Sequence, residues 1–268
     1  MPAPTNLLKR RLLNRELTTG LWLGFADPYL SELSARAGFD WVVVDNEHSP
    51  NDIKSTAGQL QAIASTDTAA VVRPVIGESW LIKQLLDIGA QTFVMPMVET
   101  AEQAAELVRA TRYPPDGIRG VGAALARASH FNAIPDYLQT ANAEICTIMQ
   151  IESAAAVENI ETIAAVEGVD GLFIGPADLS ADIGFLGRPF EPEPMAFIDA
   201  AIQRILATGR FAGILTGTTH HAQHYINLGA TFVGVGTDIT CYGKAVRELA
   251  GHYAKQAAED TDAPSGPY

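Results

Sequence analysis

The sequence predicts a single (β/α)₈ barrel. Short apolar runs alternate with amphipathic stretches, and eight such units fit into 268 residues without a linker rich in Ser or Pro. Alternation of strand and helix is typical of a parallel sheet with right-handed crossovers. Because the units number eight, a closed barrel over residues 1–256 is favoured, with an open doubly wound sheet as the alternative. The polar, Pro-rich end at residues 257–268 is predicted to be a flexible tail.

The predicted strands are short apolar runs, many of them rich in β-branched side chains. The run WVVVD at residues 41–45 shows no alternation of apolar and polar residues, which is typical of a strand buried on both faces. The other seven runs lie at residues 20–25, 69–74, 92–97, 145–152, 171–175, 211–217 and 231–236. This pattern favours a large core wrapped by helices.

The predicted helices lie between these runs. Several open on Ser, Thr or Asn, which cap a helix start, and close at Gly, which adopts the left-handed turn at a helix end. The clearest are residues 50–64, 78–90, 100–113, 153–168 and 218–230. Residues 113–139 lack such a pattern, so a long irregular connection is expected between the fourth and fifth strands. Connections of this length in compact domains are usually functional or mobile.

Composition and charge exclude several classes of protein. The formal charge of −13, from 31 acidic and 18 basic residues, argues against a nucleic-acid partner. No stretch approaches the roughly 20 apolar residues of a membrane span, and the N-terminus has no apolar signal core. These features predict a cytoplasmic protein without a membrane partner. Cys146 and Cys241 are far apart in sequence and are expected to be reduced, mostly buried thiols.

Polar and ionisable side chains follow several predicted strands. They are Asp45, Glu47 and His48 after the second strand, Arg73 on the third, and Gln150 and Glu152 on the fifth. In a parallel barrel the carboxyl ends of all strands meet at one rim. Each residue alone has a structural explanation, such as Arg73 paired with a carboxylate. Their convergence on one rim predicts an active site.

The carboxylates Glu152 and Asp178 follow adjacent strands and are the predicted ligands of a hard divalent cation. Two protein carboxylates leave open positions for water and substrate. Both acids could instead cap helices, but a cap explains one carboxylate better than two. Between the sixth strand and the next helix, Gly175 permits an unusual turn and Pro176 makes it rigid. The N–H groups of Ala177 and Asp178 would then face outward and could bind an anion.

Three motifs give weaker predictions. Asp87 closes a helix, and near a His it would fix the tautomer and raise the basicity. His220 and His224 have the i, i+4 spacing of zinc ligands, but no HExxH glutamate is present, so a solvated helix face is favoured. The glycines of GIRGVG and GVGTD do not match the dinucleotide fingerprint, although the loop after the eighth strand could hold a phosphate.

The motifs FDWVVVDNEHSPND, VVRP, QIES and VDGLFIGPADLSADIG together resemble those of the HpcH/HpaI family of metal-dependent (class II) pyruvate aldolases. The resemblance covers nearly the whole chain except the tail. It implies a (β/α)₈ barrel that assembles as a homo-hexamer and binds Mg²⁺, Mn²⁺ or Co²⁺. It also implies reversible cleavage of 4-hydroxy-2-oxo acids to pyruvate and an aldehyde, through a pyruvate enolate stabilised by the metal.

The resemblance assigns roles to individual residues. The metal ligands match Glu152 and Asp178, the base matches His48, its supporting acid matches Asp87, and the enolate-stabilising arginine matches Arg73. The implied substrate contacts are Gln150, Gly175, Pro176, Ala177 and Asp178, with Leu215 and Trp22 in the wall around the aldehyde.

Neighbouring residues complete this interpretation. Asp45 and Glu47 would order water and contacts around the metal. Asn46 stands where the family often has Gly, and the helix with His220, His221 and His224 also differs from the family pattern. The Asn46 side chain, next to the expected base, puts the aldehyde preference in doubt rather than the reaction.

Two other functions fit parts of the pattern. A citramalyl- or malyl-coenzyme A lyase of the citrate lyase β-chain type shares the barrel and the metal chemistry, but the acidic chain disfavours a large phosphorylated ligand. A barrel that only binds an oxo acid would not need base, arginine and metal acids together. The apolar stripe of the last helix, residues 245–259, could pack on a neighbouring barrel or on its own.

Overall fold

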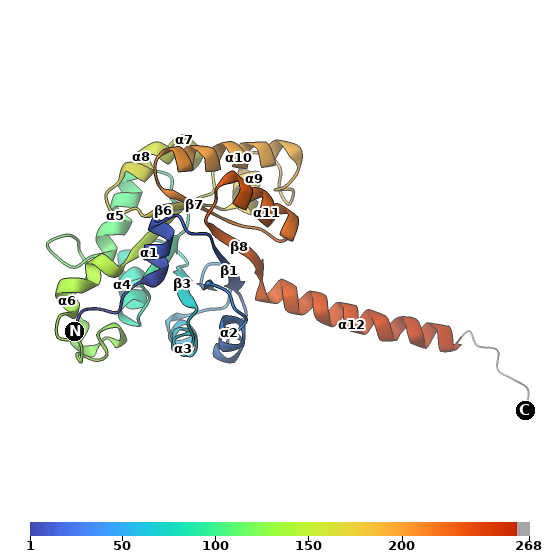
Figure 1. Cartoon of the computed structure of the whole chain (residues 1–268), viewed down its shortest axis with the longest axis horizontal. Coiled ribbons are helices and arrows are strands. Elements are labelled where there is room, and N and C mark those ends of the chain that lie inside the picture. The colour runs from blue at the N-terminus through green and yellow to red at the C-terminus, as the bar shows by residue number, and fades with distance from the viewer. Residues whose placement is uncertain (262–268) are drawn as a thin grey trace, which may run out of the picture.

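Eight parallel strands close into a barrel in chain order, with β8 paired to β1 (Figure 1). The computed structural model describes the backbone of residues 1–261 and the side chains of residues 1–254. The strands are β1 Thr18–Leu23, β2 Trp41–Asp45, β3 Ala69–Arg73, β4 Thr92–Met95, β5 Cys146–Ile151, β6 Gly171–Ile174, β7 Phe211–Leu215 and β8 Phe232–Thr237. The predicted (β/α)₈ barrel is confirmed.

The helices lie around this barrel, and all five helical stretches expected from the sequence contain helix (Figure 1). They are α1 Leu7–Leu13, α2 Pro28–Ala35, α3 Ile53–Ile63, α4 Ser79–Asp87, α5 Ala101–Thr111, α6 Tyr137–Thr140, α7 Ala154–Glu158, α8 Ile160–Ala165, α9 Pro176–Asp182, α10 Pro192–Ala207, α11 Thr219–Leu228 and α12 Asp238–Thr261. Side-chain caps at Thr100, Ser153 and Thr218 confirm three of the expected helix starts.

Alternation along the strands separates an inner core from an outer one. In β2, Trp41 and Val43 belong to the inner cluster, whereas Val42 and Val44 pack with the helices. The Trp41 ring stacks on Phe232 with 4.0 Å between ring centroids. Gly20 makes room for this ring, because a Cβ there would lie 2.1 Å from the indole. Aromatic and aliphatic side chains therefore fill the interior of the barrel below the rim.

The same two-residue repeat carries polar side chains into the barrel mouth. Side chains two positions apart on a strand share a face. Asp45 thus follows Trp41 and Val43 on the inner face of β2, and Arg73 follows the inner Val71 on β3. On β5, Gln150 and then Glu152 continue the inner row of Cys146 and Ile148. The positions of these polar groups therefore follow from the strands and do not depend on the loops.

The expected irregular connection lies between α5 and β5. It contains three short 3₁₀ turns and α6, and it forms a small core of its own with the N-terminal Ala3. Arg119, also from this connection, is almost fully buried at 1% exposure. Its guanidinium donates to Asp87 Oδ1 at 2.8 Å and lies 4.3 Å from the centre of the Tyr113 ring. The connection is therefore folded onto the barrel.

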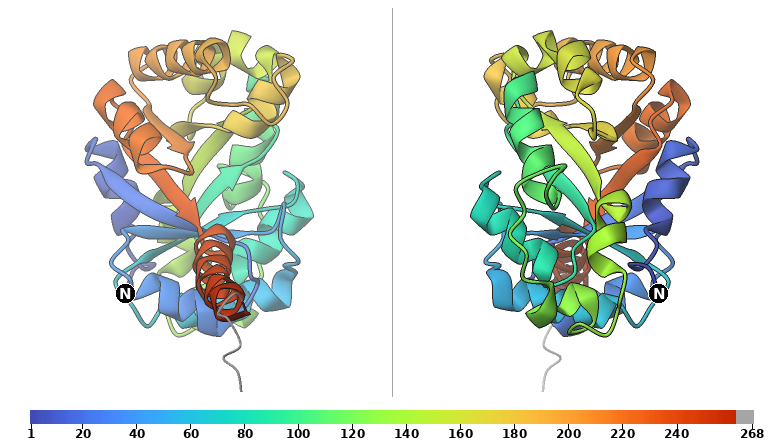
Figure 2. Two further views of the ribbon diagram at one scale, coloured as in Figure 1. Left: turned by 90° about the vertical axis from the view of Figure 1, so that its right-hand side faces the viewer. Right: turned by 90° about the vertical axis from the view of Figure 1, so that its left-hand side faces the viewer.

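Helix α12 leaves the barrel, as the side view and the end views agree (Figures 1 and 2). Beyond its first turn the side chains that the structure describes, up to residue 254, are mostly exposed, including those of Leu249 and Tyr253. Cys241 lies on this helix and is exposed, so the expectation of two buried thiols holds only for Cys146. The predicted tail at 257–268 begins within the α12 backbone, and residues 262–268 lie outside the described part of the chain.

Among the described residues, no helix has both the length and the apolar character that a membrane span needs.

Candidate active site

Arg73 is held between two carboxylates from the neighbouring strand. Its Nε donates to Asp45 Oδ1 at 2.8 Å and its Nη2 to Asp45 Oδ2 at 2.7 Å, while Nη1 lies 2.8 Å from Glu47 Oε2. Burial by itself lowers the pKa of Arg73, but the hydrogen bonds and charge of Asp45 outweigh it, so the pKa is raised. The sequence interpretation placed Asp45 and Glu47 around a metal, whereas the structure places both on Arg73.

His48 lies beside this ion pair at the rim. Its Nε2 is 3.9 Å from Glu47 Oε2, and its side chain is 65% exposed. Glu47 is much less exposed, and burial raises its pKa despite the opposing charge of Arg73. The imidazole therefore lies next to the Arg73 ion pair and is open to solvent.

Glu152 is buried at the mouth of the barrel, where it accepts two hydrogen bonds. Its Oε1 accepts from the backbone N–H of Met97 at 2.7 Å, and its Oε2 accepts from Gln150 Nε2. Burial raises the pKa of Glu152, and the charge of Asp178 raises it further. Gly175 is required by this packing, since a Cβ at that position would lie 2.7 Å from Glu152 Oε2.

Neither Glu152 nor Asp178 is the N-cap residue of a helix. The side chain of Ser153 caps α7, accepting from Ala156 N–H at 3.1 Å. Asp178 is an exposed acid in the first turn of α9, which begins at Pro176 directly after β6. The two carboxylates therefore come from adjacent strand ends, and the charge of Asp178 contributes to the raised pKa of Glu152.

The residues expected to form the aldehyde wall also meet. The Arg73 guanidinium lies 5.6 Å from the centre of the Trp22 ring. Leu215 and Trp22 both approach Gly234, where a Cβ would be 2.8 Å from Leu215 Cδ1 and 3.3 Å from Trp22 Cζ3. Trp22, Leu215 and Arg73 thus share the inner face of the mouth.

Asp87 is not brought to His48 within one chain. It ends α4, which returns from the carboxyl end of β3 toward the start of β4, so it lies toward the far end of the barrel from the rim. Its carboxylate pairs with Arg119. The expected support of the base by Asp87 is therefore not met inside a single subunit.

Asn46 and the histidine helix have structural explanations. Asn46 is buried, accepts from Thr56 Oγ1 at 2.7 Å and donates to the Arg73 carbonyl oxygen at 3.3 Å, so its side chain joins β2, β3 and α3. His224 pairs with Asp199 of α10 at 2.9 Å. No group of three or more His, Cys, Asp or Glu suited to a metal occurs in the described residues.

Sequence reasoning missed the backbone of Met97. This residue has a left-handed φ of 56°, which is uncommon for a residue other than Gly, and its N–H donates to Glu152. A backbone donor carries no signature in the side-chain pattern. The preceding Pro96 marks a turn but does not tell where the N–H points.

Residues 18–245 match the family described as HpcH/HpaI aldolase/citrate lyase. A hydroxypyruvate/pyruvate aldolase of Deinococcus radiodurans is 53% identical over 268 residues, with 98% of this chain and 97% of the relative covered. A 4-hydroxy-2-oxo-heptane-1,7-dioate aldolase of Escherichia coli strain ATCC 8739 is 53% identical over 238 residues, with 89% and 91% covered.

Solved structures give the same result. A crystal structure of an HpcH/HpaI aldolase/citrate lyase family protein from Burkholderia cenocepacia J2315 superposes with a TM-score of 0.90 at 41% identity, covering 93% of this chain and all of that one. Because relatives that are about half identical over most of their length are named as aldolases, a coenzyme A lyase or a binding-only barrel is not favoured. The chain therefore belongs to the HpcH/HpaI aldolase/citrate lyase family, and it is an aldolase.

Proposed function

We propose that this aldolase reversibly cleaves 4-hydroxy-2-oxo acids to pyruvate, or its hydroxy derivative, and an aldehyde. The observation that carries the proposal is the position of Arg73 on the same inner rim as the carboxylates Glu152 and Asp178. The carboxylate and keto oxygens of a 2-oxo acid both need positive partners. Arg73 could supply one, and a cation held by the two acids could supply the other. The names of the two half-identical relatives support this substrate class.

Glu152 and Asp178 fit one divalent cation, for which Mg²⁺, Mn²⁺ and Co²⁺ are the candidates. The two carboxylates, one of them buried, repel each other, and the raised pKa of Glu152 reflects both its burial and this repulsion. A cation between them would relieve the cost. Gln150 Oε1, buried without a hydrogen-bond partner, offers a further oxygen next to Glu152. When bound, such an ion polarises the substrate carbonyl and stabilises negative charge on its oxygen.

Arg73 would stabilise the negative charge that develops on the pyruvate part of the substrate. Asp45 and Glu47 fix the guanidinium before substrate arrives, so little reorganisation is needed during the reaction. A guanidinium also presents N–H groups beyond those that its two acids occupy. These remaining donors are available for a substrate oxygen.

His48 would move the proton. In the cleavage direction, it takes the proton of the C4 hydroxyl, the C3–C4 bond breaks, and the electron pair moves onto the pyruvate part. A proton then returns to C3, which becomes the methyl group of pyruvate. The exposed imidazole at the rim can reach either proton, directly or through water.

Asp87 would support His48 from a neighbouring copy of the chain. Only Asp87 Oδ1 bonds to Arg119, while Oδ2 faces Gly122, where a Cβ would lie 3.5 Å away. The adjoining connection exposes Val121 at 67% and Leu125 at 89%. An acid with a free oxygen beside exposed apolar residues is suited to a protein interface that buries both.

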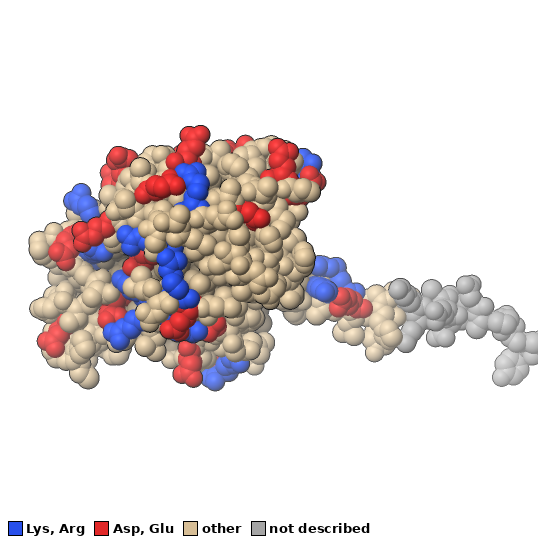
Figure 3. All heavy atoms as spheres, turned by 45° about the horizontal axis from the view of Figure 1, so that its top comes forward, with Lys and Arg blue, Asp and Glu red and all other residues tan. Residues whose placement is uncertain are grey.

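A homo-hexamer is proposed as the assembly. Helix α12 exposes Ile239, Tyr242, Val246, Leu249 and Tyr253, whose spacing of three and four residues forms one stripe. Figure 3 shows an area without Lys, Arg, Asp or Glu on the barrel beside the base of α12. A second copy that lays its α12 on this area would cover both surfaces.

The proposed function is tested by measuring pyruvate released from a 4-hydroxy-2-oxo acid. Chelator should abolish release, and Mg²⁺, Mn²⁺ or Co²⁺ should restore it, because two carboxylates and water bind a hard cation reversibly. Glu152→Gln should need far more cation for the same rate. Full activity in chelator, or an unchanged cation requirement in Glu152→Gln, would contradict the proposal.

A further inference from the structure

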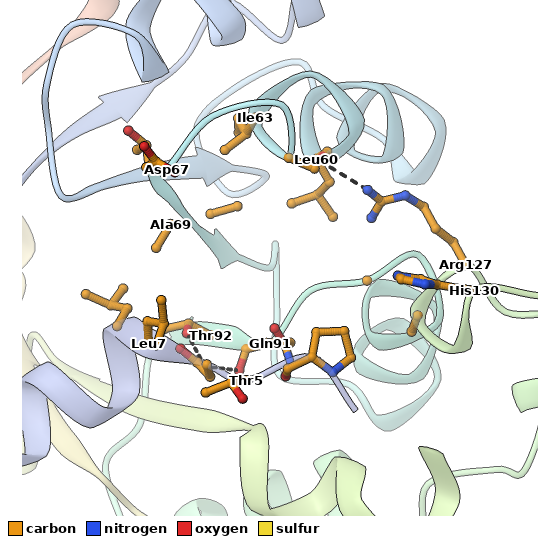
Figure 4. Close-up of a pocket in the computed structure, with 18 of the residues that line it drawn as sticks. Thr5, Leu7, Leu60, Ile63, Asp67, Ala69, Gln91, Thr92, Arg127 and His130 are labelled. Atoms are coloured by element: carbon orange, nitrogen blue, oxygen red, sulfur yellow. Dashed lines mark hydrogen bonds between the residues drawn. The ribbon is translucent and has the colours of Figure 1, made fainter. Parts of the chain in front are cut away.

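A cavity of about 490 Å³ lies at the end of the barrel opposite to the proposed active site (Figure 4). Its lining includes Ala69 and Thr92, the first residues of β3 and β4, which places it at the amino ends of the strands. The segment before α1, the end of α3 and the connection after α5 close the other sides. The volume lies within the range of about 300 to 1,000 Å³ that small-molecule sites occupy.

The cavity has an apolar wall and one basic end. Leu60, Ile63 and Ala69 form part of the wall, and Figure 4 shows the side chains of Arg127 and His130 next to each other at one end. Asp67 lies on the other side of the same space. An elongated ligand would therefore meet a cation at one end and a carboxylate at the other.

Arg127 lacks an acidic partner. Its Nη1 donates to the Ile88 carbonyl at 2.9 Å and its Nη2 to the Leu60 carbonyl at 3.4 Å, so it joins the carboxyl ends of α4 and α3. Among the described residues no carboxylate pairs with it, and burial alone lowers its pKa. Its two carbonyl bonds explain its position but leave other N–H donors of the guanidinium unassigned.

The loop that carries His130 is held in an unusual conformation. His130, Phe131 and Asn132 have φ values of 52°, 56° and 70°, all in the left-handed region that L residues other than Gly rarely adopt. Ser129 Oγ holds the loop by accepting from the Asn132 N–H at 3.0 Å. The loop places the exposed His130 imidazole beside the Arg127 guanidinium (Figure 4).

We propose that this cavity binds a small organic carboxylate with an apolar body. The carboxylate would accept hydrogen bonds from Arg127 and His130, because a planar guanidinium pairs well with a planar carboxylate. The body would lie along Leu60 and Ile63, with a hydroxyl or amino group favoured beside Asp67. A neutral ligand would not form these charge-assisted hydrogen bonds, so it should bind more weakly.

The test is calorimetric titration of benzoate into enzyme that is loaded with Mn²⁺ and saturated with pyruvate, so that the proposed active site is occupied. We expect saturable binding of one benzoate per chain, and binding of its neutral isostere benzamide at least about tenfold weaker. Arg127→Gln should weaken benzoate binding by a similar factor. Ala64→Phe, which fills the cavity and keeps the Arg127 bonds, should abolish it with normal pyruvate release.

Arg210→Gln is the matched control. Arg210 Nε donates to the Ala164 carbonyl at 2.9 Å, a similar bond to a helix end, but Arg210 does not line the cavity. Benzoate binding should be unchanged in this variant. Equal affinity for benzamide, unchanged binding in Ala64→Phe, or binding that disappears when pyruvate is present would overturn the proposal. Should Arg127→Gln fail to fold, the benzamide comparison and Ala64→Phe decide it.

Discussion

Arg73 is held in position by Asp45 and Glu47, which lie on the neighbouring strand and its continuation. Asp45 and Glu47 lie two positions apart on β2 and its continuation, and β2 pairs with β3 so that Asp45 stands directly opposite Arg73. The strand pairing therefore determines the ion pair. A sequence shows that acids follow one strand and an arginine ends the next, but only the register shows that they meet.

Replacing Arg73 should affect both catalysis and stability. Arg73→Ala removes the charge that stabilises the developing anion, a loss of roughly 10² to 10³ in turnover. It also leaves Asp45 and Glu47 buried without a partner, and breaking a buried pair typically costs about 3 to 5 kcal/mol. Steady-state kinetics and urea unfolding measure the two effects.

Arg73→Lys separates these two effects. A lysine restores one charge near the acids, but it cannot copy the planar fork that bonds to both Asp45 oxygens. Stability should therefore recover in part while turnover stays low. Turnover above about half of wild type in either variant would show that Arg73 does not stabilise the reacting charge.

Glu152 gives a pH-dependent prediction. Burial raises its pKa above the ordinary value of 4.5, so ionising it destabilises the metal-free fold as the pH rises through the raised pKa. Glu152→Gln has no such charge. In chelator it should melt at a higher temperature than wild type at pH 7, and the difference should vanish near pH 4, below the ordinary pKa.

Added Mn²⁺ should then raise the melting temperature of wild type but not of Glu152→Gln, since binding to the folded state alone stabilises it. Glu167→Gln, at an exposed acid, is the control and should behave as wild type. Equal melting temperatures of wild type and Glu152→Gln at pH 7 in chelator would refute the burial argument.

At the scale of elements, the sequence was most informative for the strands. Runs such as WVVVD are buried on both faces, so their composition has one explanation, and β2 occupies the predicted residues. Helices were less exact. The stretch at 153–168 forms α7 and α8 separated at Asn159, whose side chain donates to the Glu99 carbonyl at 2.8 Å. A tertiary hydrogen bond of this kind leaves no periodic pattern to detect.

In the candidate site, too, the residues at strand ends could be predicted from the sequence, whereas Asp87 could not. Strand-end residues converge because side chains on every second position share a face, and this applies to Trp22, Arg73, Glu152 and Leu215 alike. Asp87 could not be placed by that rule. It sits on a helix that runs against the strands, so its proposed partner cannot be found within one chain.

Helix α12 offers a prediction about assembly. Leu249→Asp puts a carboxylate in the exposed apolar stripe, and burying that charge against another copy would be costly. The variant should shift from the oligomer toward the 28.6 kDa monomer, as light scattering at micromolar concentration would measure. Lys244→Asp is the matched control, because Lys244 lies on the opposite side of the helix at 100° per residue. Unchanged mass in Leu249→Asp would show that α12 does not join copies.

At the scale of the whole molecule, the proposed role of Asp87 would make each site depend on two copies of the chain. One chain supplies Arg73, His48 and the two carboxylates, but its Asp87 pairs with Arg119 beside exposed apolar residues. The apolar side chains of α12 at Leu249 and Tyr253 are exposed, and the helix leads away from its own barrel (Figure 1). Both features find a use if a second copy meets the rim. Catalysis and assembly would then be linked, because the site would need a contact between copies.

Mixing inactive variants tests this link. If His48 and Asp87 of one site come from different chains, His48→Ala and Asp87→Ala subunits, each nearly inactive alone, should regain activity when co-expressed. Random pairing gives about one quarter of the sites both native residues, so roughly that share of wild-type activity is expected. Co-expressing His48→Ala with Glu152→Gln is the control. Those two residues stand on one rim of one chain, so no mixed site contains both native residues, and activity should stay low. Recovery in the control as well, or in neither mixture, would show that each chain works alone and that Asp87 has another role.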